Sequence, residues 1–150
     1  MKTEVLFSSN SGVWETPQDF FEKLNAVFHF TLDACALPEN AKCERYYTPE
    51  DDGLSQPWTG NVWCNPPYGR NISEWLRKAH DEIGRNADVI VMLVHARTDT
   101  AWFHDYVYEK PNVELHFVRG RLKFGGGKVN APFPSVVLVF RPAIKWEANP

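Results

Sequence analysis

The residues best suited to chemistry are Asn65-Pro66-Pro67-Tyr68, which directly follow the apolar run Val62 to Cys64. Each proline fixes its own φ angle, removes an N–H donor and biases the preceding residue toward extended conformations. The carbonyls of this turn are therefore not used up by a helix that begins there. An amide, accessible carbonyls and an aromatic ring at a strand end are the groups needed to hold a planar group that carries an NH2.

Polar residues also follow two other predicted strands. Asp33 ends an apolar segment, and His95 to Asp99 follow the most hydrophobic run of the chain. A lone aspartate after a strand is often only a turn or cap residue. In open α/β sheets, however, ligands bind beyond the carboxyl ends of the strands. Three such ends on one edge predict a pocket there.

The elements that must position these residues alternate between strands and helices. Thr16 and Pro17 have the types expected at a helix start, so we predict a helix over residues 17–28. Ser73 is the expected cap of a second helix, and Thr98 or Asp99 that of a third. Residues 37–60, interrupted by Pro and Gly, leave room only for a helical turn near 39–45. The predicted strands are residues 30–36, 61–64, 88–94, 114–118 and 136–140.

This order predicts an α/β fold with a mostly parallel sheet, helices on both faces and a terminal antiparallel strand pair. Residues 1–12 are expected to form a flexible lead-in, and residues 13–150 a single domain. The chain has no apolar run long enough for a membrane span and its first residues do not resemble a signal peptide, so we expect a cytoplasmic protein. The three cysteines, at 35, 43 and 64, are expected to be reduced thiols.

Charge is distributed unevenly along the chain. Residues 1–75 carry 5 basic and 11 acidic side chains, whereas residues 76–150 carry 11 and 8. If nucleic acid is the partner, the second half is expected to supply the phosphate contacts. Ordinary solvated surface charge is the alternative. The candidates for these contacts are Arg97, Arg119, Arg121, Lys123 and Lys128.

Several other chemistries lack their motifs. The sequence contains no phosphate-binding loop, no dinucleotide fingerprint and no nucleophile elbow, and its five histidines show no metal-ligand spacing. No metal is therefore expected. Asp51 and Asp52 form either a pair of acids or an Asp-Asp-Gly turn, and the sequence does not decide between them.

A wider set of motifs resembles a known family, the phage and prophage Dam-like adenine-specific DNA methyltransferases. The resemblance extends from about residue 12 to residue 141. The motifs that carry it are Trp14-Glu15-Thr16-Pro17, Leu32-Asp33-Ala34-Cys35-Ala36, Asn40-Ala41-Lys42-Cys43, Asp51-Asp52-Gly53-Leu54, Trp63-Cys64-Asn65-Pro66-Pro67-Tyr68, Arg97-Thr98-Asp99-Thr100, Gly120-Arg121-Leu122-Lys123-Phe124 and Ala131-Pro132-Phe133-Pro134-Ser135.

The resemblance implies a Rossmann-like methyltransferase fold and S-adenosylmethionine as cofactor. It assigns Trp14, Thr16 and Pro17 to a segment that closes over the methionine part of the cofactor, and Asp33-Ala34-Cys35-Ala36 to the first-strand cofactor motif. The usual glycine-rich turn is absent here. About thirty residues separate Asp33 from Asn65, so the middle of the sheet is expected to be abbreviated. Asp51 is the candidate contact to the cofactor adenine.

The implied reaction is methyl transfer to the amino group of an adenine that is flipped out of double-stranded DNA. Tyr68 is expected to stack on the base, while the Asn65 side-chain carbonyl and the Pro66 backbone carbonyl accept hydrogen bonds from its amine. Phe133 and Phe124 are candidate walls for the base, with core packing as the alternative. The residues assigned to DNA are Arg70, Arg97, Arg119, Arg121, Lys123, Phe124 and Lys128.

Other readings stay open at this point. The same motif serves enzymes that methylate cytosine, RNA bases or a protein glutamine, and a catalytically inactive nucleic-acid-binding domain is a further alternative. With 150 residues there is little room for a separate recognition domain, so we expect a short or relaxed site read by residues 70–72, 97–101 and 119–134. A phage enzyme of this kind acts in restriction-modification or in regulation, in the host cytoplasm.

Overall fold

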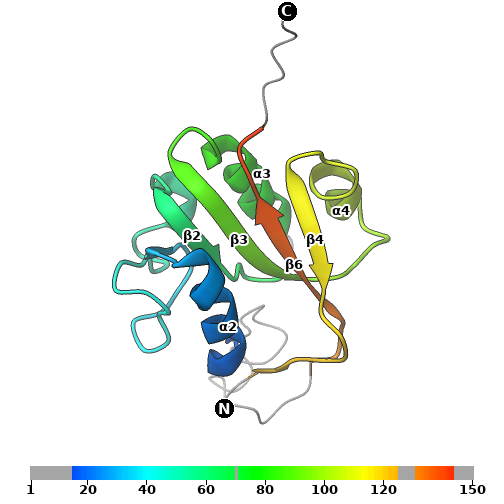
Figure 1. Ribbon diagram of the computed structural model, residues 1–150, viewed down its shortest axis with the longest axis horizontal. Helices are drawn as coiled ribbons and strands as arrows, with labels where there is room; N and C mark the ends of the chain where they lie inside the picture. Colours follow the sequence, from blue (N-terminus) through cyan, green and yellow to red (C-terminus); the bar gives the residue numbers. More distant parts are fainter. Residues whose placement is uncertain (1–14, 70, 125–130, 144–150) are drawn as a thin grey trace, which may run out of the picture.

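The computed structural model describes residues 15–69, 71–124 and 131–143 and contains one five-stranded sheet. Its strands lie in the order β1-β2-β3-β6-β4 (Figure 1). β1 pairs with β2 and β2 with β3 in parallel, whereas β6 is antiparallel to both β3 and β4. The predicted α/β class and terminal antiparallel pair are confirmed. The strands are β1 (Leu32–Asp33), β2 (Gly60–Cys64), β3 (Ala87–His95), β4 (Val113–Phe117) and β6 (Ser135–Phe140).

The central strand β3 is buried on both faces. Residues 89–94 form its unbroken apolar run, and their exposed fractions are 8% or less. In the register of the sheet, Val91 lies between Trp63 of β2 and Val139 of β6. A strand with neighbours on both edges and helices on both faces has no polar side to present, which is why its sequence does not alternate.

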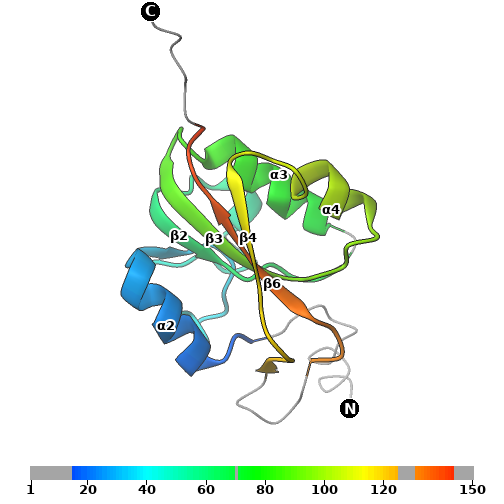
Figure 2. The ribbon, with the colours of Figure 1, turned by 45° about the vertical axis from the view of Figure 1, so that its right-hand side comes forward.

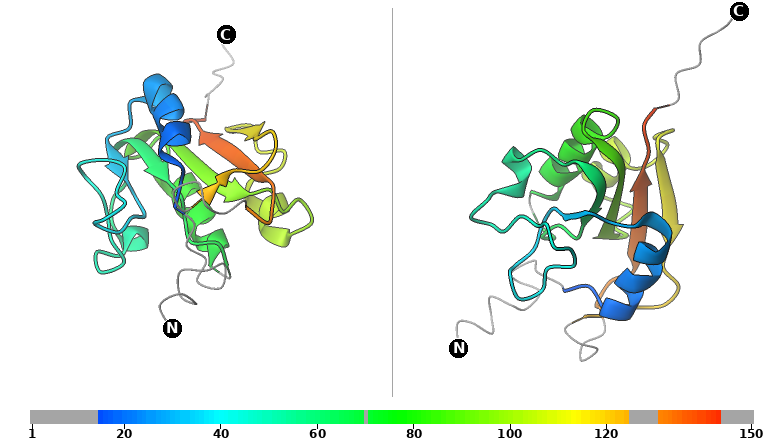
Figure 3. Two further views of the ribbon diagram at one scale, coloured as in Figure 1. Left: turned by 90° about the horizontal axis from the view of Figure 1, so that it is seen from below. Right: turned by 60° about the vertical axis from the view of Figure 1, so that its left-hand side comes forward.

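Helices cover both faces of the sheet. α2 (Gln18–Phe28) lies on one face, and α3 (Ile72–Glu82) and α4 (Ala101–Tyr106) lie on the other (Figures 1 and 3). Two apolar clusters result. One joins Trp63, Val91 and Val139 to Phe21 of α2, and the other joins alternate residues of the same strands to α3 and α4.

α2 confirms the helix predicted over residues 17–28 but not its predicted cap. Pro17 occupies the N-cap position, and no side chain caps the helix. The hydroxyl of Thr16 is instead engaged at the site described below. Phe21 fastens the helix to the sheet, with its ring centroid 5.3 Å from that of Trp63 in an edge-to-face arrangement. The helix ends at Phe28, and its C-cap residue His29 has a left-handed φ of 53°.

The N-caps of the other two helices are also different residues from those predicted. Asn71 precedes α3, so Ser73 lies inside the helix. Thr100 caps α4 by accepting a hydrogen bond from the N–H of Phe103, in place of the predicted Thr98 or Asp99. In each case several polar residues adjoin the helix start, and sequence alone does not decide which of them has the non-helical backbone that a cap requires.

The segment 34–59 joins β1 to β2 without a regular strand-helix unit. The helical turn predicted near 39–45 is wrong, because the helical turn of this segment, η2, lies at Gly53–Ser55. A Cβ on Gly53 would lie 2.3 Å from the carbonyl oxygen of Ala34, so only glycine fits there. β1 is also shorter than predicted. The predicted abbreviation of the sheet is confirmed, because β1 pairs directly with β2 (Figure 2).

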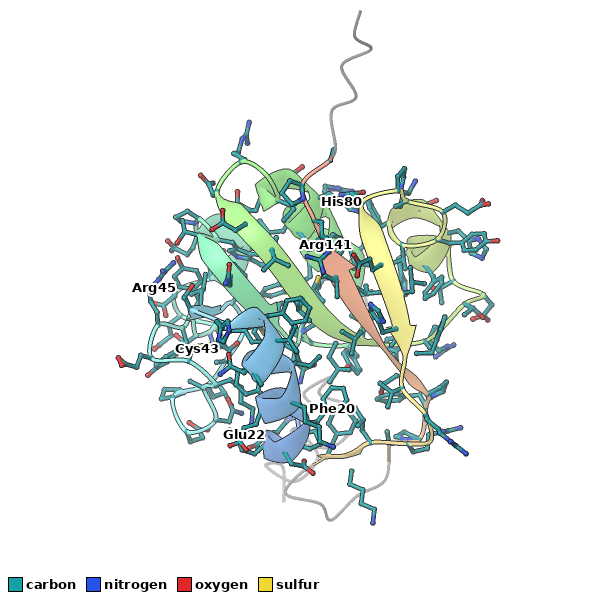
Figure 4. The ribbon with its side chains drawn as sticks, viewed as in Figure 1. Phe20, Glu22, Cys43, Arg45, His80 and Arg141 are labelled. Atoms are coloured by element: carbon teal, nitrogen blue, oxygen red, sulfur yellow. The ribbon has the colours of Figure 1, made fainter. Side chains whose placement is uncertain are left out.

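This segment also packs beside α2. Cys43 lies close to the helix, whereas Arg45 projects farther out (Figure 4). Cys35, Cys43 and Cys64 are free thiols, as predicted. In the part of the chain described by the structure, no helix is long and apolar enough to cross a membrane.

The packing of α2 predicts a strong difference between two phenylalanines. Phe21→Ala should lower the free energy of unfolding by about 3–5 kcal/mol, because the ring is 2% exposed and its removal leaves a cavity against Trp63. Phe117→Ala is the matched control. This ring is 62% exposed, so the loss should stay below about 1 kcal/mol in urea unfolding. Equal losses in both variants would contradict the placement of α2.

Candidate active site

The turn Asn65-Pro66-Pro67-Tyr68 forms the wall between two clefts. β1, β2 and β3 are parallel, so their carboxyl ends meet at one edge of the sheet, and the turn leaves that edge from the middle strand. Asn65, Pro66 and Pro67 line the first cleft, which has a volume of about 100 Å³. Tyr68 lines the second cleft, of about 350 Å³. The four motif residues thus face two separate spaces.

Asn65 is tied to the segment that precedes α2. Its side-chain NH2 donates a 2.9 Å hydrogen bond to the hydroxyl of Thr16. Thr16 is 3% exposed and lines the first cleft together with Asn65. The sequence places these two residues 49 positions apart and does not predict their contact, because the contact depends on where α2 docks.

Tyr68 is fixed by its hydroxyl and surrounded by rings. The hydroxyl donates a 3.0 Å hydrogen bond to the carbonyl of Leu93 on β3. Burial raises the pKa of this phenol, so the hydroxyl remains a donor at neutral pH. The rings of His95 and Phe133 lie edge-to-face with Tyr68 at 4.8 and 5.4 Å between centroids. One hydrogen bond therefore holds an aromatic wall in a set position.

Asp33 ends β1 and organises the loop that follows. One carboxylate oxygen accepts the N–H of Cys35 at 3.2 Å, and the other accepts that of Lys42 at 2.9 Å. The side chain is 2% exposed, and burial raises its pKa to about 6 against the opposing effect of these two N–H groups. Asp33 thus holds residues 34–42 as a cradle in the absence of the glycine-rich turn.

The rest of the predicted first-strand motif divides between cleft and core. Cys35 and Ala36 line the first cleft beside Asp33, whereas Ala34 is fully buried and donates its N–H to the carbonyl of Trp63. Burial raises the pKa of the Cys35 thiol to about 12, so it stays protonated and does not act as a nucleophile.

Lys42 is a cleft residue for which the sequence alone predicted no role. Among the described residues that line the first cleft, it carries the one positive charge, opposite the carboxylates of Glu15 and Asp33. Its ammonium donates to the side-chain carbonyl of Gln18 at 2.7 Å. Asn40 lines the same cleft, and its own side-chain oxygen accepts the N–H of Leu37. Both residues belong to the Asn40-Ala41-Lys42-Cys43 motif of the family resemblance, which was the one feature of the sequence that could have identified them as cleft residues.

The second cleft is lined by aromatic and cationic side chains. His95, Trp102 and Phe133 line it with Tyr68, and the exposed Arg97 lies at its rim. Burial and the charge of Arg97 lower the pKa of His95 to about 4, so the imidazole is neutral at pH 7. Phe133 lines this cleft and packs against Tyr68, His95 and Phe124, so its role as a wall for the base stays a prediction.

Other predicted residues lie outside both clefts. The Asp51 carboxylate accepts hydrogen bonds from the N–H of Thr48 at 2.8 Å and from its hydroxyl at 3.1 Å. Of the two alternatives left by the sequence, Asp51 therefore belongs to a turn and not to a pair of acids. Phe124 is 1% exposed and packs behind Phe133, so its side chain belongs to the core and is not available to DNA. Pro17 is not among the described lining residues.

The predicted cationic residues are dispersed. Arg119 lines a separate apolar groove beside α2, and Arg121 donates a 3.2 Å hydrogen bond to the carbonyl of Ala131. Lys123 is exposed. Trp14, Arg70 and Lys128 lie outside the described residues, as do residues 1–12 and the glycine run 125–127. Within the described ranges, no group of His, Cys, Asp or Glu side chains is arranged to hold a metal ion.

Comparison with known proteins identifies the family. The family model described as DNA N-6-adenine-methyltransferase (Dam) matches residues 4–145. The chain belongs to the Dam family. The DNA N-6-adenine-methyltransferase of Haemophilus phage HP1 (strain HP1c1) is 28% identical over 142 residues, which are 89% of this chain and 81% of that protein. The protein of the same name from Escherichia phage T1 is 37% identical over 94 residues, or 61% of this chain and 39% of that one.

Membership in the Dam family confirms the resemblance found in the sequence and the enzyme class that it implies. The match extends over nearly the whole chain, so it includes the segment before α2, the irregular segment 34–59 and the Asn65–Tyr68 turn. These are the parts that meet around the two clefts.

The raised pKa of Asp33 predicts a pH dependence of stability. The pKa of this carboxyl is about 6 in the folded protein, whereas its ordinary value, taken for the unfolded chain, is 3.8. Between these two pH values the folded state therefore binds more protons than the unfolded state. The contribution of Asp33 to the free energy of unfolding is fully present below about pH 4 and is lost as the pH rises through 6. The loss amounts to roughly 2–3 kcal/mol.

Urea unfolding of the wild type and Asp33→Asn at pH 4, 5, 6 and 7 measures this loss. The difference between the two proteins should fall as the pH rises. A difference independent of pH would contradict the buried placement of the carboxyl.

Proposed function

We propose that this protein uses S-adenosylmethionine to methylate the exocyclic amino group of adenine in DNA. The observation that carries the proposal is the wall between the two clefts. Asn65 and Pro66 face the first cleft, and Tyr68 faces the second. A donor on one side and a planar amine on the other would therefore meet at the same four residues.

The first cleft fits the cofactor in charge. S-adenosylmethionine carries a carboxylate, an ammonium and a sulfonium, and the cleft offers one cation, Lys42, and two acids, Glu15 and Asp33. Since the carboxylate of Asp33 is occupied by two backbone N–H groups, we assign the cofactor ammonium to Glu15 and the cofactor carboxylate to Lys42. When bound, the cofactor would supply a methyl group already activated by its sulfonium and would leave as the thioether S-adenosylhomocysteine, with one amine proton released to water.

The protein's part in the reaction is to position the amine. The carbonyl end of the Asn65 amide and the backbone carbonyl of Pro66 accept its two N–H groups, which turns the nitrogen lone pair away from the ring and toward the donor. Tyr68 holds the plane of the base, and its hydrogen bond to Leu93 fixes the ring before the substrate arrives. Alignment and preorganised acceptors of this kind are a main source of rate acceleration when the donor is already reactive.

The geometry of the second cleft supports base flipping. Tyr68 is half-buried below the rim, so a base stacked within a duplex does not reach it. An extruded base does. Phe133 and Trp102 supply further apolar walls, and Arg97 at the rim is placed for a backbone phosphate. The predicted short recognition site and the contributions of Arg119, Arg121 and Lys123 remain part of this proposal.

Transfer of labelled methyl from S-adenosylmethionine to duplex DNA, RNA and protein tests the proposal. Label should appear as N6-methyladenine in DNA, and Asn65→Ala should lower the single-turnover rate by about 10²–10³-fold because an aligned acceptor is lost. Asn112→Ala, which changes an amide just before β4 that lines neither cleft, is the matched control and should retain the wild-type rate.

Three results would count against the proposal. Absence of label in every substrate would remove the enzymatic function, and label in cytosine, RNA or glutamine would change the substrate. Full activity of Asn65→Ala would remove the assigned mechanism.

The charge pattern of the first cleft predicts a selective loss of affinity. Lys42→Met should weaken binding of S-adenosylhomocysteine roughly 10-fold, the equivalent of about 1.4 kcal/mol for one charged contact. Binding of 5′-methylthioadenosine, which lacks the carboxylate, should not change. Isothermal titration with both ligands measures this, and Lys23→Met on the exposed side of α2 is the control. Equal losses for the two ligands would contradict the role of Lys42.

A further inference from the structure

Thr16 lies where the cofactor cleft meets the methyl-acceptor site. Its hydroxyl accepts the hydrogen bond from the Asn65 NH2 group, and its side chain is 3% exposed. A threonine before a helix commonly caps it, but α2 has no side-chain cap. The hydroxyl is therefore directed at Asn65 rather than at the helix.

The position of Thr16 is fixed by the packing of α2. The N–H of Phe21 donates to the carbonyl of Pro17 at 3.1 Å, and the Phe21 ring packs against Trp63, two residues before Asn65. The same contact therefore sets the helix start and the strand end relative to each other. Thr16 and Asn65 are brought together by rigid elements rather than by a loose loop.

We propose that Thr16 is a positioning residue that fixes the amide plane of Asn65 for methyl transfer. An asparagine amide has a donor end and an acceptor end. By holding the NH2 end, Thr16 sets the orientation of the carbonyl end, which the proposed function uses as an acceptor for the substrate amine. Loss of that bond removes a restraint on the terminal torsion of the amide, and even a small misalignment of a reacting group is costly in rate.

This role differs from the one implied by the family resemblance, which placed Thr16 over the methionine part of the cofactor. A residue that only contacts cofactor changes affinity. A residue that orients Asn65 changes the transfer step while affinity is retained. The inference rests on the proposed role of Asn65, but the hydrogen bond itself is testable without any reaction.

Three substitutions separate the hydroxyl from the rest of the side chain. Thr16→Val replaces the hydroxyl by a methyl group of similar size, Thr16→Ser keeps the hydroxyl, and Thr16→Ala removes both groups. Thr16→Val should lower the single-turnover rate on the order of 10- to 100-fold, with the Kd of S-adenosylhomocysteine changed less than about threefold. Thr16→Ser should keep the rate within about threefold of wild type.

The hydroxyl both accepts and donates, which gives a second kinetic test. In Asn65→Asp, the Thr16 hydroxyl can donate to one carboxylate oxygen and leave the other as acceptor. This variant should keep measurable activity, whereas Asn65→Asp combined with Thr16→Val should have much lower activity, since the Thr16 donor to the carboxylate is then removed. Equal activity of the single and double variants would overturn the inference.

An NMR measurement on the protein without substrate provides a readout independent of activity. The side-chain NH2 signals of Asn65, assigned by their loss in Asn65→Ala, should exchange slowly with solvent in wild type and Thr16→Ser and faster in Thr16→Val. If Thr16→Val does not fold, Thr16→Ala against Thr16→Ser makes the same comparison.

The possible outcomes are distinct. Unchanged exchange in Thr16→Val, or a loss of affinity that accounts for the whole loss of rate, would overturn the positioning role. A wild type that transfers no methyl group but shows protected Asn65 signals would overturn the proposed function while confirming the Thr16–Asn65 bond.

Discussion

The position of β2 between β1 and β3 is the constraint on which the site depends. All three strands are parallel, so the turn after β2 necessarily leaves the sheet between two other strand ends. Residues from β1 and its loop form one cleft beside the turn, and residues after β3 form the other. The same placement anchors the turn at both ends, through Thr16 near Asn65 and through Leu93 beneath Tyr68.

The connection between β1 and β2 lacks a regular strand-helix unit, and the buried carboxylate of Asp33 compensates for the hydrogen bonds that such a unit would make. Only the irregular segment 34–59 joins these strands, and its backbone N–H groups need acceptors that a regular element would supply. The buried Asp33 carboxylate accepts two of them, and β1 and Tyr46 to Tyr47 pair along the edge. The segment thereby forms a wall of the first cleft without a regular helix or strand. This arrangement buries the Asp33 carboxyl, and burial raises its pKa.

Much of this arrangement was predictable from local sequence. The apolar run of β3, the amphipathic α2 and the double proline at residues 66–67 each specify their own conformation, so the fold class and the motif at the strand end were confirmed. Contacts that join distant segments were not predictable. The meeting of Thr16 with Asn65, the part of Lys42 in the cleft and the burial of Phe124 depend on how α2 and residues 34–59 dock, which no local pattern specifies.

The turn from Asn65 to Tyr68 is proposed to border both the cofactor and the base and to align the amine with the methyl donor. A crystal structure of the protein with S-adenosylhomocysteine and a short duplex that contains an extrudable adenine tests this proposal most directly. We expect the cofactor in the cleft with Asp33 and Lys42, the adenine against Tyr68, and its amine within hydrogen-bond distance of the Asn65 side-chain carbonyl and the Pro66 carbonyl. A cofactor bound elsewhere, or a base that enters without contacting Tyr68, would contradict it.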